Sequence, residues 1–138
     1  MNIVVLSGRI AHDLELRTAE NGSNYVVFSL AVPKPLNADK RAEFKANNRS
    51  TADYIRCICF HKLADILFEN TKKGGRIQVM GSIQSGSAVD EEGEIRYITN
   101  ILVQKVDIVD WKNDKKKNQT LPEEEVYEES FAEEFPFN

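Results

Sequence analysis

Five segments of this chain alternate apolar and polar residues with the period of a β-strand, and this repetition limits the fold more than any other feature. The segments are rich in valine, isoleucine, phenylalanine and tyrosine, and glycine, asparagine or charged residues separate them. In order they are NIVVLSGRI (2–10), SNYVVFSLAV (23–32), DYIRCICF (53–60), RIQVMGSI (76–83) and YITNILVQKVDIV (97–109). The sequence therefore predicts five strands.

One helix is predicted between the third and fourth strands, in HKLADILFENTKKGG (61–75). Leu63, Ile66 and Leu67 recur there at helical spacing, and Gly74 follows as a stop signal. Three strands, a helix and two strands are the order that a barrel of the OB type requires, with the helix closing the barrel. We therefore expect an all-β fold, a five-stranded OB-fold Greek-key barrel with one inserted helix.

The acidity of the chain belongs to its last segment. Residues 1–112 carry 15 basic and 14 acidic side chains, a net charge of +1, whereas residues 113–138 carry 3 and 8, a net charge of −5. Like-charge repulsion and low apolar content in this last segment predict a disordered acidic tail. The expected parts are an OB-fold domain (1–110), a flexible linker (111–126) and an acidic, aromatic protein-docking tip (127–138).

The predicted strand 53–60 has two different faces. The small or apolar face consists of Ile55, Cys57 and Cys59. The opposite face carries Tyr54, Arg56 and Phe60. A nucleotide needs a flat ring for its base and a cation for its phosphate, so these three residues are candidate contacts to nucleic acid. The alternative, which the pattern leaves open, is that the two rings cover a neighbouring subunit or helix.

The two cysteines form C-x-C-x-H with His61, a possible fragment of a metal site. The other histidine, His12, is distant in sequence, and no standard zinc spacing is present. We expect Cys57 and Cys59 to face the core in a reduced compartment, with no metal site and no cofactor.

The connection between the second and third strands, residues 34–53, is long for a hairpin loop. It has five basic residues against three acidic ones, and Phe44 lies among them. The basic residues are Lys34, Lys40, Arg41, Lys45 and Arg49. We expect a mobile basic arm that contacts nucleic acid. An ordinary solvated loop is the open alternative, and ADKRAEFKA (38–46) also fits a short helical turn.

Four stretches carry short motifs in a fixed order. They are GRIAHDLELRTAENGSNYVVFSLAV, with D-x-E-L-R and F-x-L-A-V; DYIRCICFHKLADIL, with F-x-K-L-A; KKGGRIQVMGSI, with K-K-G and V-x-G; and GEIRYIT, with R-Y-x-T. Over residues 2–110, the chain resembles bacterial-type single-stranded DNA-binding proteins. The resemblance implies sequence-independent binding and protection of single-stranded DNA in replication, recombination and repair, by a homotetramer or a dimer.

The resemblance also extends the set of candidate single-stranded DNA contacts. The full set is Tyr54, Arg56, Phe60, Lys34, Lys40, Arg41, Phe44, Lys45, Arg49, Lys72, Lys73 and Arg96. Family members commonly present tryptophans for stacking, but here the matching positions hold Tyr54 and Ala88. Loss of a ring predicts weaker binding or a shorter site. The short linker is typical of compact phage or plasmid versions.

The last residues, EEFPF, resemble the acidic tip of that family. They imply a docking peptide for replication, recombination and repair proteins, made of Glu133, Glu134, Phe135, Pro136 and Phe137. Phe137 is expected to fill an apolar pocket on the partner while the glutamates meet a basic rim. The family tip ends at the phenylalanine, whereas Asn138 follows it here, which puts recognition by the usual partners in question. A turn that packs back on the domain is the alternative.

Other classes of function have less support. Asp13 and Glu15 alternate, but no base, nucleophile or phosphate-binding glycine loop accompanies them, so an enzyme such as a nuclease is not expected. An OB-fold adaptor of a primosome or recombination complex, with weak DNA binding, is the main alternative. No long apolar stretch or signal peptide is recognisable, so we expect a cytoplasmic, nucleoid-associated protein, or one in the host cytoplasm if it is phage-encoded.

Overall fold

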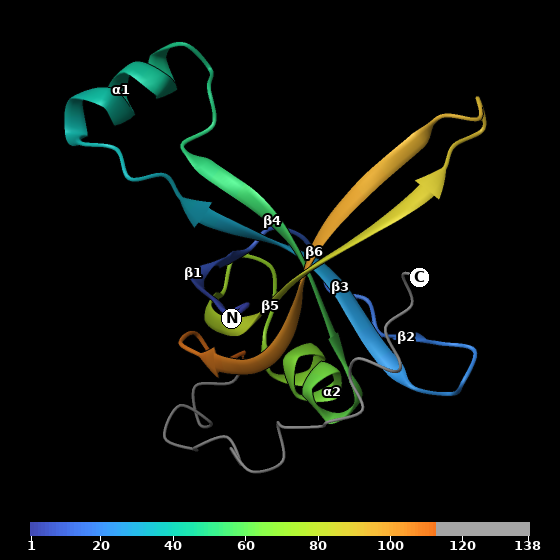
Figure 1. Ribbon diagram of the computed structural model, residues 1–138. Helices are drawn as coiled ribbons and strands as arrows, with labels where there is room; N and C mark the ends of the chain where they lie inside the picture. The colour runs from blue at the N-terminus through green and yellow to red at the C-terminus, as the bar shows by residue number, and fades with distance from the viewer. Residues whose placement is uncertain (113–138) are drawn as a thin grey trace.

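Within residues 1–112, the part of the chain that this computed structural model describes, six strands form one sheet that closes on itself (Figure 1). In chain order the elements are β1 (Val4–Ile10), β2 (Arg17–Thr18), β3 (Asn24–Pro33), α1 (Ala38–Ala46), β4 (Ala52–Phe60), α2 (His61–Asn70), β5 (Arg76–Val89) and β6 (Ile95–Ile108). The order in the sheet is β1-β5-β6-β4-β3-β2, and β1 also pairs with β3. This closed sheet, with α2 between β4 and β5, confirms the OB-type barrel.

The five predicted strands are all present, and three differences accompany them. The two-residue strand β2 was not predicted, because two residues carry no periodicity. The last two strands are longer than predicted, since β5 continues to Val89 and β6 already begins at Ile95. A second helix, α1, lies in the predicted arm and confirms the alternative of a helical turn at 38–46.

The barrel closes where the end of β1 meets β3. Arg9 pairs with Ala31 and Ile10 with Leu30, while residues 4–9 of β1 pair with β5 on the other side. A side chain at Gly8 would not fit, because a Cβ there would lie 2.4 Å from the carbonyl oxygen of Ala31. The glycine therefore allows the two backbones to approach closely enough to complete the barrel.

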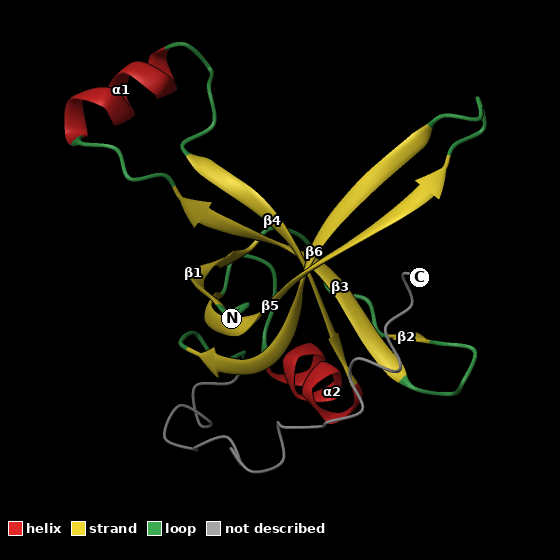
Figure 2. Ribbon diagram, viewed as in Figure 1, coloured by secondary structure: helices red, strands yellow, loops and turns green. Residues whose placement is uncertain are grey.

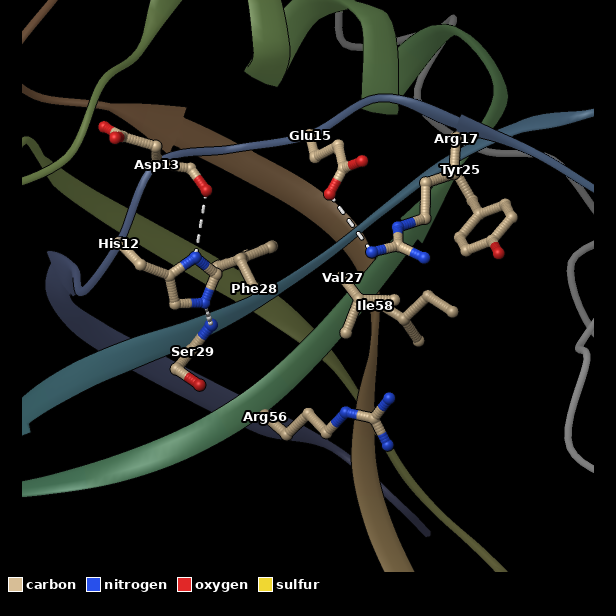
Figure 3. Close-up of a pocket in the computed structure, with 10 residues that line it drawn as sticks. All are labelled: His12, Asp13, Glu15, Arg17, Tyr25, Val27, Phe28, Ser29, Arg56 and Ile58. Atoms are coloured by element: carbon tan, nitrogen blue, oxygen red, sulfur yellow. Dashed lines mark hydrogen bonds and ion pairs between the residues drawn. The ribbon is translucent and has the colours of Figure 1, made fainter.

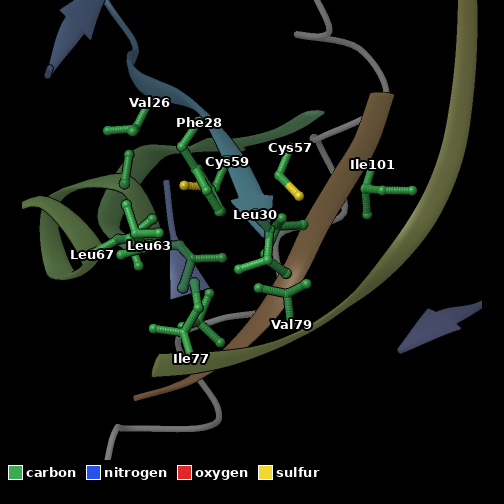
Figure 4. Close-up of a cluster of buried hydrophobic side chains, with 14 of the residues drawn as sticks. Val26, Phe28, Leu30, Cys57, Cys59, Leu63, Leu67, Ile77, Val79 and Ile101 are labelled. Carbon is green, nitrogen blue, oxygen red and sulfur yellow. The ribbon is translucent and has the colours of Figure 1, made fainter. Parts of the chain in front are cut away.

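Apolar residues from five strands and α2 fill the barrel (Figure 4). Phe28, Leu30, Ile77 and Val79 are among the buried side chains of the strands. From α2, Leu63, Ala64 and Leu67 join them, so the helix closes one end of the barrel with its apolar face. Neither helix of the described residues is long and apolar enough to cross a membrane.

Two hairpins extend from the barrel and diverge (Figure 2). One is formed by β3 and β4 and carries α1 at its end, and the other is formed by β5 and β6. The N-cap of helix α1 is Asn37, whose side chain accepts a hydrogen bond from the backbone N–H of Lys40 at 2.8 Å. Asp39 in its first turn and Lys45 in its last turn both complement the helix dipole.

A cluster of charges fastens the end of β6 to the start of β5. The carboxylate of Asp110 accepts hydrogen bonds from the backbone N–H, the Nε and the Nη2 of Arg76 at 2.9 to 3.0 Å, and the Arg9 guanidinium lies 3.9 Å away. These bonds from the Arg76 side chain and backbone lower the pKa of Asp110 from 3.8 to about 2. The ionised carboxylate is therefore favoured in the folded chain.

We predict that Asp110→Asn lowers the Tm at neutral pH. Because the folded-state pKa is depressed, the stabilisation is complete above the ordinary value of 3.8 and is lost as the pH falls through about 2. Thermal melts at several pH values should therefore show a Tm difference from wild type that disappears towards pH 2. Asp107→Asn, on the exposed side of β6, is the control. A difference that stays constant down to pH 2 would contradict this account.

Candidate nucleic-acid interface

The predicted division of β4 into two faces is present in the structure. Ile55, Cys57 and Cys59 all face the main core. Tyr54 and Arg56 are exposed on the outer face, where the tyrosine retains 62% of its accessible surface. On the neighbouring strand β3, they pair with Ala31 and Ser29, whose short side chains leave room around them. The ring and the cation thus lie on one open face.

Phe60 alternates to the same face of β4 as Tyr54 and Arg56, but unlike them it is not exposed. Its side chain is 0% exposed, and its ring centroid lies 5.9 Å from that of Tyr25 and 6.2 Å from that of His61. It belongs to a second buried cluster with Ile58 and Leu102. A base does not reach a ring that is closed to solvent, so the expectation that Phe60 offers an open stacking face does not fit this geometry.

A groove of about 510 Å³ lies beside Arg56, between residues 12–17 and the outer faces of β3 and β4 (Figure 3). Its lining residues are His12, Asp13, Glu15, Arg17, Tyr25, Val27, Phe28, Ser29, Arg56 and Ile58. The imidazole of His12 holds the segment in place, because its Nε2 accepts a hydrogen bond from the Ser29 N–H at 3.1 Å. Its Nδ1 lies 3.0 Å from the Asp13 carbonyl oxygen and therefore carries the proton.

Charges inside this groove are partly compensated. Arg17 donates a hydrogen bond from Nη2 to the carboxylate of Glu15 at 3.1 Å. Arg56 provides a second guanidinium at the opposite wall, as Figure 3 shows. No local pattern marks His12, Arg17 or Tyr25 as binding residues, because these residues come together only when β2 pairs with β3 and β3 pairs with β4.

The arm, residues 34–53, is an ordered segment with several internal contacts. At its base, Lys34 forms an ion pair with Asp53, and the Lys34 carbonyl oxygen accepts a hydrogen bond from Arg41 Nη2 at 3.1 Å. Within α1, Lys40 pairs with Glu43 at 3.4 Å. These contacts hold α1 at the end of the hairpin, so the arm contains an ordered helix and is not an irregular loop.

One ring of the arm is already covered. The guanidinium carbon of Arg49 lies 4.0 Å from the centre of the Phe44 ring, a cation–π contact. Arg49 also donates its backbone N–H to the Phe44 carbonyl oxygen at 2.8 Å. Phe44 thus presents at most one face to a ligand, and Arg49 and Lys45 are exposed cations beside it.

Three further predicted contacts lie apart from Tyr54 and the arm. Lys72 and Lys73 are exposed in the turn between α2 and β5, which a 2.8 Å hydrogen bond from Gly74 N–H connects to the Ile10 carbonyl oxygen. Arg96 lies on the β5–β6 hairpin and donates from Nε to Asp90 at 2.9 Å. These three residues line neither the groove nor the arm.

The β5–β6 hairpin does carry an aromatic ring, although not at Ala88. Ala88 pairs with Arg96, whereas Tyr97 pairs with Ser87 and therefore lies on the opposite face of the hairpin. Tyr97 retains 80% of its accessible surface. This tyrosine belongs to the R-Y-x-T motif, and its exposure follows from the hairpin being longer than the sequence predicts.

Burial determines the protonation state of the two cysteine thiols. Both face the core, as predicted. Burial raises the pKa of the Cys57 thiol to about 12, and burial together with the neighbouring Cys57 raises that of Cys59 further. The thiols are thus packing residues in their protonated form. The docking residues Glu133, Glu134, Phe135, Pro136 and Phe137 lie outside the described residues.

Comparison with known proteins gives a consistent set of similarities. The profile of the Single-strand binding protein family matches residues 1–109. The chain is 37% identical over 94 residues to a single-stranded DNA-binding protein of Fusobacterium nucleatum, a match that covers 68% of this chain and 57% of that protein. A Clostridium perfringens protein of the same name is 35% identical over 111 residues (80% and 67% of the two chains), and one from Staphylococcus aureus is 30% identical over 126 residues (91% and 76%).

Proposed function

The chain belongs to the Single-strand binding protein family, and from this we propose that it binds single-stranded DNA without sequence preference. The observation that carries the proposal is the exposed ring of Tyr54 beside the guanidinium of Arg56 on the outer face of β4. Every base has a face that stacks on a ring, and every nucleotide has a phosphate that a cation attracts. This pair of groups therefore suits any sequence.

The geometry around the pair favours a strand that runs over the outer face of β4. From Tyr54, a path leads past Arg56 into the groove that Tyr25 and Arg17 line. In the other direction, β3 and β4 lead to α1 and its exposed cations Lys45 and Arg49. In a duplex the base faces are stacked on one another, so only a single strand offers them to Tyr54.

We also propose a role for the other parts of the chain. The match to residues 1–109 supports a DNA-binding domain over 1–110, followed by a linker (111–126) and a docking tip (127–138). Through the tip the protein would recruit replication, recombination and repair proteins in the cytoplasm. The adaptor alternative with weak DNA binding keeps some support from Ala88, where the hairpin lacks a ring.

We propose a homotetramer built from dimers, with a dimer as the simpler assembly. The side chains of Ile3, just before β1, and of Val5, within it, are both exposed. Between Val4 and Gly8, β1 pairs with β5 on one edge, and pairing with β3 begins only at Arg9. An open strand edge beside exposed apolar residues is usually covered, and a second β1 would cover it.

Tyr54→Ala should weaken binding to oligonucleotides of every sequence to a similar degree. Loss of one stacked base costs about 1 to 3 kcal/mol, or a roughly 5- to 150-fold higher Kd. Fluorescence titrations with thymine-rich and mixed oligonucleotides of increasing length would measure it. Tyr54→Phe, which keeps the ring, is the matched control and should bind like wild type. Equal affinities for Tyr54→Ala and wild type would refute the stacking role, and weak binding by wild type itself would favour the adaptor.

Removal of the arm cations by Lys45→Gln and Arg49→Gln should flatten the salt dependence of binding. For single strands the slope of log Kobs against log[salt] changes by about 0.7 for each lost phosphate contact. The same titrations at several salt concentrations give this slope. Lys72→Gln with Lys73→Gln is the comparison, because the structure places these lysines outside the groove and the arm. The arm would have no special role if both pairs changed the slope equally.

Deletion of residues 127–138 should abolish capture of partner proteins while DNA binding stays intact or becomes slightly tighter at low salt. An acidic segment competes with phosphate for the same cations, and added salt screens this competition. Phe137→Ala should reproduce the loss of capture without changing DNA affinity, because one buried anchor often dominates a small peptide interface. Pull-downs with a recombination or repair helicase would test it. Unchanged capture by the deletion variant would exclude the docking role.

A further inference from the structure

The β5–β6 hairpin ends in an acidic turn that does not suit DNA. Asp90 is used inside the turn, where its carboxylate accepts hydrogen bonds from the backbone N–H groups of Glu92 and Glu94 at 3.0 and 2.8 Å and from Arg96 Nε at 2.9 Å. Glu91, Glu92 and Glu94 remain exposed, and none of them forms an ion pair among the residues 1–112. Three uncompensated carboxylates repel phosphate groups.

An apolar face adjoins this turn. Val89 and Ile95 pair across the two strands, and Tyr97 follows on the same face. All three side chains are exposed, the first two at 71% and 61%. Exposed apolar residues beside a charged rim are typical of an interaction surface. We call Val89, Ile95 and Tyr97, together with Glu91, Glu92 and Glu94, the hairpin surface.

Helix α1 has the complementary properties. It has nine residues and buries none of them, although helices shorter than about 12 to 15 residues are marginal on their own. Ala38, Ala42 and Ala46 repeat at four-residue spacing and so line one side of it. Lys45 and Arg49 are exposed at its C-terminal end. The helix thus offers a small-residue face with positive charge beside it and lacks a packing partner among the described residues.

Within one chain these two surfaces do not meet. Figure 1 shows that the two hairpins diverge, with α1 and the acidic turn at their far ends. No ion pair joins α1 to the acidic turn in the part of the chain that is described. Within residues 1–112, neither surface therefore covers the other, and both are available to a second molecule.

We propose that the hairpin surface of one copy docks on α1 of a second copy. Glu91, Glu92 and Glu94 then meet Lys45 and Arg49, and the apolar residues cover the alanine face of the helix. The contact is separate from the open edge of β1. It places carboxylates of the second copy on cations that we assign to DNA, so the second copy and DNA phosphates compete for Lys45 and Arg49. It does not require the proposed function, because it forms without DNA.

Reversal of the turn charges tests the contact. We expect Glu91→Lys, Glu92→Lys and Glu94→Lys together to weaken self-association about tenfold at low salt, as measured by sedimentation velocity at micromolar concentration without DNA. Association of the wild type should itself weaken between about 50 and 300 mM salt. The control is Glu20→Lys, Glu69→Lys and Asp107→Lys, an equal change of charge at exposed sites elsewhere, which should stay within about twofold of wild type.

A charge swap makes the test specific. Adding Lys45→Glu and Arg49→Glu to the turn variant should restore association to within about threefold of wild type. The proposal is overturned if the turn variant associates like wild type, if the control weakens association equally, or if the swapped chain melts normally but does not associate. The turn variant should still bind a short oligonucleotide at least as tightly as wild type, so a failure of DNA binding there would count against the proposed function and not against this contact.

Discussion

The orientation of the side chains of β4 controls most of what this protein is proposed to do. Cys57 and Cys59 are packed in the core, and the two-residue period of a strand then directs Tyr54 and Arg56 outwards. Nine residue pairs with β3 hold this register, and β6 supports it from the other side through Cys57 and Ile101. A shift by one residue would expose two thiols and bury the ring and the cation. Core packing therefore positions the candidate site.

The same periodicity explains why much of the fold was predictable from the sequence. Segments with one buried face, such as Asn24–Pro33, show alternation, and α2 shows helical spacing. The distal half of the β5–β6 hairpin has no such signal, because residues 84–88 are small or polar and lie outside the core. Pairing with the neighbouring strand holds them extended. The sequence thus indicates which segments form the barrel but not how far its hairpins reach.

The candidate site was predictable only where it lies on one strand. Alternation within β4 was enough to predict the outward face of Tyr54 and Arg56. Alternation gives the face of the sheet on which a side chain lies, but it does not show which other residues cover that side chain. Phe60 has the same phase and is buried against Tyr25. The groove depends on His12, which is 17 residues from its hydrogen-bond partner Ser29. No local sequence pattern predicts a contact over that separation. The structure is needed to identify residues that only the closure of the barrel brings together.

Charge separation along the two hairpins explains how a domain with a net charge of +1 over residues 1–112 is suited to a polyanion. Electrostatic interactions between exposed charges fade over about 8 to 10 Å at moderate salt. A phosphate near Lys45 and Arg49 therefore responds to the arm, while the acidic turn acts on whatever lies at the end of the other hairpin. Because the hairpins of one copy diverge, its own attraction and repulsion act at different places instead of cancelling. The net charge of the domain is thus a poor guide to its ligand, and the distribution of charge over its extensions is a better one.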